Sequence, residues 1–95
     1  MIESIYISDL KKLSNIDIID IRSIQKYNNN HIKNAINIPT ENLLLNFNKY
    51  LSKNKKYYIY CDHGIQSKKM CQILKQNGYN VVNIIGGYEA WILSE

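Results

Sequence analysis

The sequence has no apolar run approaching the roughly 20 residues that a helix needs to cross a bilayer. Its first residues lack the basic segment and the apolar core of a secretory signal. Its net charge of +4 is spread along the chain, without the basic cluster that favours binding to nucleic acid. We therefore expect a cytoplasmic protein that binds neither a membrane nor nucleic acid.

Cysteine is also scarce, since the chain has only Cys61 and Cys71. Cytosolic thiols are normally reduced. A disulfide between the two would require Cα atoms within about 7 Å of each other, which the intervening loop and helix disfavour. Together with His31 and His63, the cysteines show no spacing familiar from metal sites, so we expect no metal and no organic cofactor.

The 95 residues leave room for one hydrophobic core, and we expect residues 1–95 to form a single domain. Runs that favour strands alternate with helical patterns, which is typical of an α/β fold with a mostly parallel sheet and helices on both faces. Ser8 and Thr40 are the expected N-caps of two helices. The expected strands are residues 4–7, 16–21, 35–38, 57–60 and 80–85, and the expected helices are 8–13, 23–30, 40–51, a segment ending at 77–78, and 88–93.

The stretch from Tyr57 to Met70 carries the strongest chemical signal. An aromatic, β-prone run ends at Tyr60, Cys61 follows, and a loop containing Gly64 leads into a helical pattern. The free N–H groups of such a loop and of the first helical turn, together with the helix dipole, favour a negatively charged sulfur. A lone cysteine can also be a small buried residue. Its position at the end of a strand favours a reactive thiol over that alternative.

The residues around this cysteine are less specific. Cys71 fits one helical face with Met70 and Leu74, so we expect it in the core. Asp62 would repel an anionic ligand if it pointed inward, so we expect it to face solvent. We expect His63 to be an exposed loop residue.

Three parts of the sequence resemble the rhodanese homology domain. Residues 18–22 (IIDIR), followed by Tyr27 and by residues 31–39 (HIKNAINIP), are similar to the family signature DvR…EY…GHIpGAinIP. Residues 59–67 (IYCDHGIQS) are similar to the active loop vyCxxGxRS, and residues 82–91 (VNIIGGYEAW) to the ending v.nl.GG..aW. The segments follow the family's order and span most of the chain, which makes the resemblance specific.

This resemblance implies a sheet of five strands flanked by helices, and a sulfurtransferase that works through Cys61. Cys61 would take a sulfane sulfur from thiosulfate or a persulfide donor, and the resulting persulfide would pass it to a thiol, to cyanide or to a protein acceptor. We expect the protein to be a monomer. The loop amides implied to bind the transferred group are those of Asp62, His63, Gly64, Ile65, Gln66 and Ser67.

The loop departs from the family pattern in its charge. Phosphatase relatives have a loop one residue longer, ending in an arginine that would fall on Ser67, so a phosphatase activity is disfavoured. Many sulfurtransferases of the family have arginine where this chain has Gln66. Asp62 makes the loop still more negative. We therefore expect modest activity with thiosulfate and a preference for less charged persulfide donors.

Basic residues outside the loop are candidates for the missing charge. Lys26 lies four residues after Arg22, where some rhodaneses have a basic residue that reaches the donor, although an exposed helix lysine is an equal alternative. Arg22 is a second candidate for charge support. We expect Arg22 to form a structural polar cluster with Asp20 and His31 behind the loop.

Two other functions remain open at this point. One is a non-catalytic rhodanese module that binds a protein partner, which Gln66 leaves open and which the intact Cys61 disfavours. The other is a thiol redox protein that uses Cys61 and Cys71. Loading of a single sulfur onto Cys61 would separate the sulfurtransferase from both.

Overall fold

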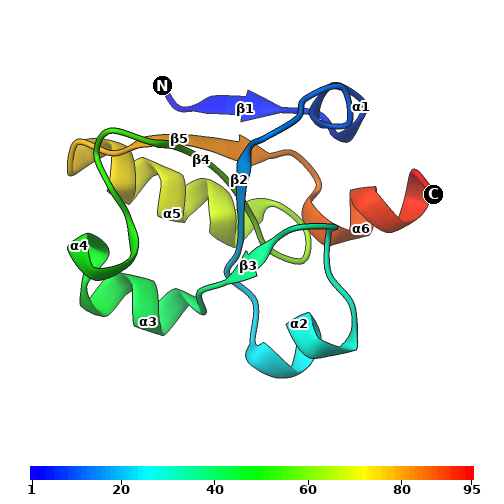
Figure 1. Cartoon of the computed structure of the whole chain (residues 1–95), viewed down its shortest axis with the longest axis horizontal. Coiled ribbons are helices and arrows are strands. Elements are labelled where there is room, and N and C mark those ends of the chain that lie inside the picture. Colours follow the sequence, from blue (N-terminus) through cyan, green and yellow to red (C-terminus); the bar gives the residue numbers. More distant parts are fainter.

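Short β-branched and aromatic runs form one five-stranded sheet in the computed structural model, which describes residues 1–95 (Figure 1). All neighbouring strands are parallel, in the order β1-β5-β4-β2-β3. The predicted α/β fold with five strands is therefore confirmed, and its sheet is entirely rather than mostly parallel. The strands are β1 (Glu3–Ile5), β2 (Asp17–Asp20), β3 (Ile36–Asn37), β4 (Lys56–Tyr60) and β5 (Asn80–Ile84).

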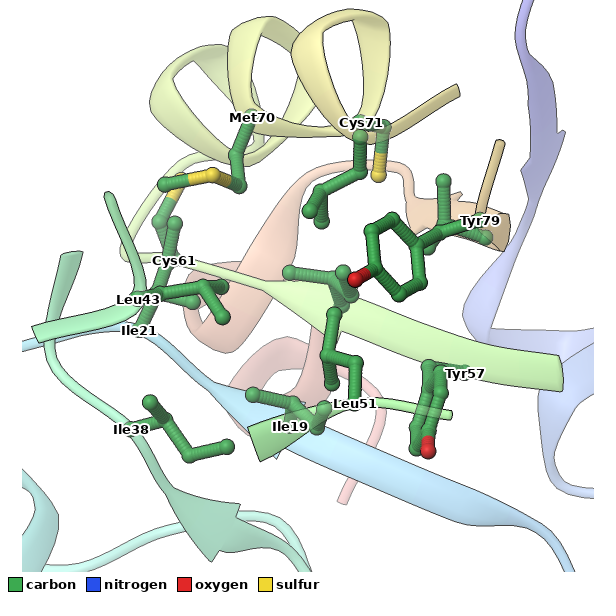
Figure 2. Close-up of a cluster of buried hydrophobic side chains, with 13 residues drawn as sticks. Ile19, Ile21, Ile38, Leu43, Leu51, Tyr57, Cys61, Met70, Cys71 and Tyr79 are labelled. Atoms are coloured by element: carbon green, nitrogen blue, oxygen red, sulfur yellow. The ribbon is translucent and has the colours of Figure 1, made fainter. Parts of the chain in front are cut away.

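Helices cover both faces of this sheet, as the alternation of side chains along β4 requires. Tyr57 and Ile59 pack in a cluster with side chains of α3, α4 and α5, whereas Tyr58 and Tyr60 pack with those of α1, α2 and α6. Figure 2 shows the first cluster, which contains both cysteines. The helices are α1 (Ile7–Leu10), α2 (Ile24–Asn29), α3 (Thr40–Leu45), α4 (Phe47–Tyr50), α5 (Ile65–Gln76) and α6 (Gly87–Leu93).

Both predicted helix caps are wrong. α1 begins one residue before Ser8, which therefore lies inside the helix. The N-cap of α3 is Pro39, and the hydroxyl of Thr40 donates instead to the carbonyl oxygen of Ile21 at 3.1 Å. Local sequence shows which side chains can cap a helix, but here the end of β2 offers Thr40 a different acceptor.

The predicted helix over residues 40–51 is divided into α3 and α4. The chain leaves the helical conformation at Asn46, whose side-chain oxygen accepts a hydrogen bond from the amide of Lys49 and so starts α4. Leu43 and Phe47 nevertheless pack in the same cluster. The apolar spacing thus predicted the buried face correctly and the continuity of the helix incorrectly.

The strand order produces a reversal between β2 and β4. From β2 the chain continues outward to β3, and from β4 it continues to β5 on the other side. In parallel sheets, ligands bind at the carboxyl ends of the strands beside such a reversal. Arg22 follows the end of β2 and Cys61 follows the end of β4, so both stand at this edge. None of the helices combines the length and the apolar character needed to cross a bilayer.

Candidate active site

Cys61 lies at the junction of β4 and the loop that starts α5. It belongs to the same buried cluster as Ile59, two residues earlier, on the face that α5 covers (Figure 2). Only 4% of the residue is exposed. Gly64 occupies the N-cap position of α5 with φ 91°, in the left-handed region that glycine favours. The predicted succession of strand, cysteine, tight loop and helix is therefore present.

The sulfur of Cys61 has three hydrogen-bond contacts. The backbone amides of Gly64 and Ser67 donate to Sγ at 3.2 and 3.3 Å, and the thiol donates to Ser67 Oγ at 3.3 Å. Two amide dipoles directed at one sulfur stabilise negative charge on it. Four other loop amides make no hydrogen bond to the sulfur, those of Asp62, His63, Ile65 and Gln66. Their role in binding the transferred group stays a prediction.

Asn83 of β5 supports the loop, a role that was not predicted from the sequence. Its Oδ1 accepts a hydrogen bond from Ser67 Oγ at 2.6 Å, and its Nδ2 donates to the carbonyl oxygen of Gly64 at 3.3 Å. Asn83 is 3% exposed, so these bonds satisfy a buried amide. The available signal was an asparagine between the apolar residues Val82 and Ile84, because a polar side chain in the interior of a buried strand needs polar partners nearby.

The start of α6 holds the loop from another side. The amides of Tyr88 and Glu89 donate to the carbonyl oxygens of Cys61 and Asp62 at 2.9 and 3.0 Å. Gly87 approaches so closely that a Cβ there would overlap the carbonyl oxygen of Cys61. The pair of glycines after β5, which the sequence predicts as a turn, is therefore also part of the loop's support.

A buried ion pair lies at the end of β2. Arg22 donates to both carboxylate oxygens of Asp20, from Nε at 3.1 and 3.0 Å and from Nη2 at 2.7 Å, and Tyr60 donates its hydroxyl to Asp20 Oδ2 at 2.6 Å. Burial by itself would lower the pKa of Arg22, but the hydrogen bond and charge of Asp20 outweigh it, so this pKa is raised. Burial and the hydrogen bond to Asp20 raise the pKa of the Tyr60 hydroxyl. The charge of Arg22 is therefore balanced mainly by Asp20.

The predicted cluster of Asp20, Arg22 and His31 is right for the first two residues and wrong for His31. The ring of His31 stacks on Tyr27, with 3.9 Å between ring centroids, and its Nδ1 lies 2.8 Å from the carbonyl oxygen of Tyr27. The place expected for His31 beside Asp20 is taken by Tyr60.

Asp62 was predicted to face solvent, but in the structure it lies between two basic side chains. Its Oδ2 lies 2.6 Å from Nζ of Lys26 in α2, and its Oδ1 lies 3.8 Å from Nη1 of Arg22. The side chain is 36% exposed. The prediction considered only repulsion from an anionic ligand. It could not include Lys26, which is 36 residues away in the sequence.

A pocket of about 640 Å³ opens beside the loop. Gln66 lines it, as do both candidates for charge support. Cys61 is not among the lining residues, so the pocket contacts the loop through Asp62 and Gln66 and does not enclose the sulfur. The charged lining residues are Arg22, Lys26, Glu41, Asp62 and Lys69.

The remaining candidates lie where the sequence predicts them. Cys71 is fully buried in the core, and burial together with the charge of Cys61 raises its pKa to about 12. Both cysteines are free thiols. His63 is an exposed loop residue, with Nδ1 3.4 Å from Glu89 Oε2. No group of three or more His, Cys, Asp or Glu side chains is arranged to hold a metal ion.

Comparison with known proteins places this geometry in context. The family described as "Rhodanese-like domain" matches residues 6–94. A protein from Coxiella burnetii named thiosulfate sulfurtransferase GlpE is 34% identical over 84 residues, which cover 87% of this chain and 78% of that protein.

Solved structures agree with this match. A rhodanese-like domain protein from Staphylococcus aureus superposes with a TM-score of 0.86 at 34% identity, covering 95% of this chain and 91% of that one. A rhodanese-related protein from Thermoplasma volcanium superposes with a TM-score of 0.89 at 33% identity, covering 97% and 92%.

Proposed function

Since the chain belongs to the rhodanese-like family, we propose that it is a sulfurtransferase in which Cys61 carries the transferred sulfur. One observation supports this most directly: the sulfur of Cys61 accepts hydrogen bonds from two amides at the start of α5. The proposed donor is thiosulfate or a persulfide, and the proposed acceptor is a thiol, cyanide or a protein thiol. Residues 1–95 act as one unit in this proposal.

The proposed reaction has two steps. The first attack is on the sulfane sulfur of the donor, and the second is on the terminal (outer) sulfur of the Cys61 persulfide. The Cys61 thiolate attacks the sulfane sulfur of thiosulfate. The S–S bond of the donor breaks, and sulfite leaves with the bonding electron pair. Cys61 is then a persulfide anion. An acceptor thiolate or cyanide attacks the outer sulfur, forming a new persulfide or thiocyanate and returning Cys61 to its thiolate.

The loop stabilises the charged sulfur in this scheme. Amides already oriented before the reaction need no reorganisation as charge develops, which is the reason such dipoles are effective in catalysis. The amides of Gly64 and Ser67 donate to the inner sulfur, which is Sγ of Cys61. We propose that the remaining loop amides bind the outer sulfur once it is present: those of Asp62, His63, Ile65 and Gln66. A reducing compartment such as the cytosol fits two free thiols.

Mass spectrometry of the intact protein after incubation with thiosulfate, and separately with a low-molecular-weight persulfide, tests the proposal. We expect a gain of one sulfur atom that maps to Cys61, is removed by cyanide and is absent in Cys61→Ser. Cys71→Ala is the matched control, because its thiol is fully buried in the core, and we expect it to load normally.

The other two candidate functions give different results. A module that only binds a protein partner would gain no sulfur from either donor. A redox protein would lose two hydrogens on oxidation, as Cys61 and Cys71 join. The raised pKa of Cys71, about 12, argues against that role, because a resolving thiol must ionise.

A further inference from the structure

The charges beside the candidate site cancel one another. Arg22 is bound by Asp20, and Lys26 lies 2.6 Å from Asp62. Asp62 also lies 3.8 Å from Arg22. These four residues carry two positive and two negative charges. Three cations line the pocket, and only Lys69 has no acidic partner within ion-pair distance, while Glu41 adds a negative charge to the same lining.

We propose that Asp62 sets which sulfur donors the protein accepts, by cancelling the charge of Lys26 in the lining of the pocket. This inference rests on the proposed function and adds the substrate class to it. Because the pair carries no net charge, a dianion such as thiosulfate gains little attraction there. The favoured donor is an organic persulfide, which carries at most one negative charge on its sulfur.

The apolar part of the pocket supports this substrate class. Leu44 and Ile73 line it and remain 47% and 38% exposed, and Ile21 and Met70 line it from the core. Apolar surface of this kind gains from contact with a carbon skeleton, which an organic persulfide has and thiosulfate lacks. Gln66, also in the lining, contributes a hydrogen-bonding amide without charge.

The position of the ion pair limits the size of the effect. The side chains of Lys26 and Asp62 are 57% and 36% exposed, so solvent screens them. For charges near a surface, we expect that one unit of charge changes the loading rate of a dianion by about five-fold at low salt. A donor with one negative charge should respond less.

The test measures the second-order rate constant for loading of Cys61, by quenched mass spectrometry, with thiosulfate and with 2-hydroxyethyl hydropersulfide. Four proteins are compared: wild type, Asp62→Asn, Lys26→Gln and the double variant. We expect Asp62→Asn to raise the thiosulfate rate about five-fold and Lys26→Gln to lower it by a similar factor. In the double variant the pair of positions 26 and 62 again carries no net charge, so the thiosulfate rate should return close to that of the wild type. Added salt should shrink these differences.

Asp9→Asn is the matched control, because Asp9 of α1 also forms an ion pair with a lysine, Lys12 at 3.5 Å, but lies away from the pocket. It changes the net charge equally and should leave the ratio of the two rates unchanged. If the substitution distorted the loop, the loading rates with both donors would change in the same direction. Opposite changes in the two single variants, with recovery in the double variant, would not follow from distortion.

The outcomes separate this inference from the proposed function. If the wild type loads from both donors but Asp62→Asn leaves the ratio of rates unchanged, the role of Asp62 is wrong and the sulfurtransferase remains. A strong wild-type preference for thiosulfate would also overturn it. If neither donor loads Cys61 in the wild type, the sulfurtransferase itself is wrong, and the inference falls with it.

Discussion

Ser67 connects the sulfur of Cys61 to the end of β5. Its amide donates to Sγ, its hydroxyl accepts from the thiol, and the same hydroxyl donates to Asn83 Oδ1 at 2.6 Å. Asn83 in turn donates to the carbonyl oxygen of Gly64, which closes a ring of contacts around the loop. One buried hydroxyl therefore links the sulfur, the loop and β5.

Replacing this hydroxyl tests its importance. In Ser67→Ala, Asn83 Oδ1 loses its partner inside the protein, and an unsatisfied buried polar group costs about 1–3 kcal/mol. We expect the free energy of unfolding in urea to fall by that amount. Alkylation of Cys61 by iodoacetamide should become faster, because the lost hydrogen bond is one that only the protonated thiol donates, so its loss favours the reactive thiolate. Ser8→Ala, an exposed serine within α1, is the control, and equal losses in the two variants would contradict the prediction.

At this scale, the sequence predicted the identity of the central residues better than their contacts. Cys61 and Gly64 were identified from their place between a strand and a helical pattern. Asn83 was missed, and Asp62 was predicted to face solvent, because both depend on partners from distant segments. Neither a residue's own chemistry nor its neighbours in the chain can show which side chain the fold brings against it.

At the scale of elements, α6 acts as a support for the active loop. Its first amides bind the carbonyl oxygens of Cys61 and Asp62, and its first residue, Gly87, touches the same segment. The chain order hides this relation, because the loop lies between β4 and α5 and α6 comes after β5.

A substitution at Gly87 separates the effect of this contact from the effect of backbone conformation. Gly87 and Gly78 both have positive φ, 59° and 90°, but a Cβ at Gly78 would meet only the flexible side chain of Lys53 at 3.5 Å. Both alanine variants pay about 1–2 kcal/mol for the left-handed backbone. We expect Gly87→Ala to lose about 1–3 kcal/mol more, because its Cβ overlaps a carbonyl oxygen.

Urea unfolding measures this difference, and loading of Cys61 with sulfur gives a second measurement. Gly87→Ala should load more slowly, whereas Gly78→Ala should keep the wild-type rate once it is folded. Equal stability and equal loading in the two variants would show that α6 does not support the loop.

The central elements were predictable because they bury regular apolar patterns. The strands β2, β4 and β5 follow from such patterns, whereas the edge strands β1 and β3 are short and have no buried residue. The C-terminal end of α5 at Asn77 was predictable from the pair Asn77–Gly78. The division between α3 and α4 was not predictable from spacing, since the buried face continues across it. Asn46 is a residue that can either remain inside a helix or start a new one, and tertiary contacts decide between these.

At the scale of the whole molecule, buried titratable groups should make the fold sensitive to alkali. Burial, and secondarily the charge of Cys61, raises the pKa of Cys71 from 9.0 to about 12. Between these values the unfolded thiol has lost its proton while the folded thiol keeps it. The contribution of Cys71 to the free energy of unfolding is therefore fully present below pH 9 and is lost as the pH rises toward 12. Tyr60, whose pKa burial also raises, acts in the same direction.

The contribution of Cys71 can be isolated by comparing the wild type with Cys71→Ala. We expect the free energy of unfolding of the wild type to fall more steeply above pH 9, by up to about 1.4 kcal/mol per pH unit. The variant starts less stable at pH 7, because it has lost buried volume. Urea unfolding at pH 7, 9 and 10.5 checks the difference in slope, and parallel pH profiles would contradict it.

The pairing of β1 with β5 has a consequence for how the chain folds during its synthesis. Glu3 is in register with Val82, so β1 must wait for a strand that lies much later in the chain. Such a high contact order slows folding, because distant segments must meet before their contacts contribute any stability. Until β5 emerges, β1 has no partner and β4 has a bare edge where β5 will bind. Newly made chains are therefore most prone to aggregate before β5 has emerged, when chaperones would have the largest effect on yield.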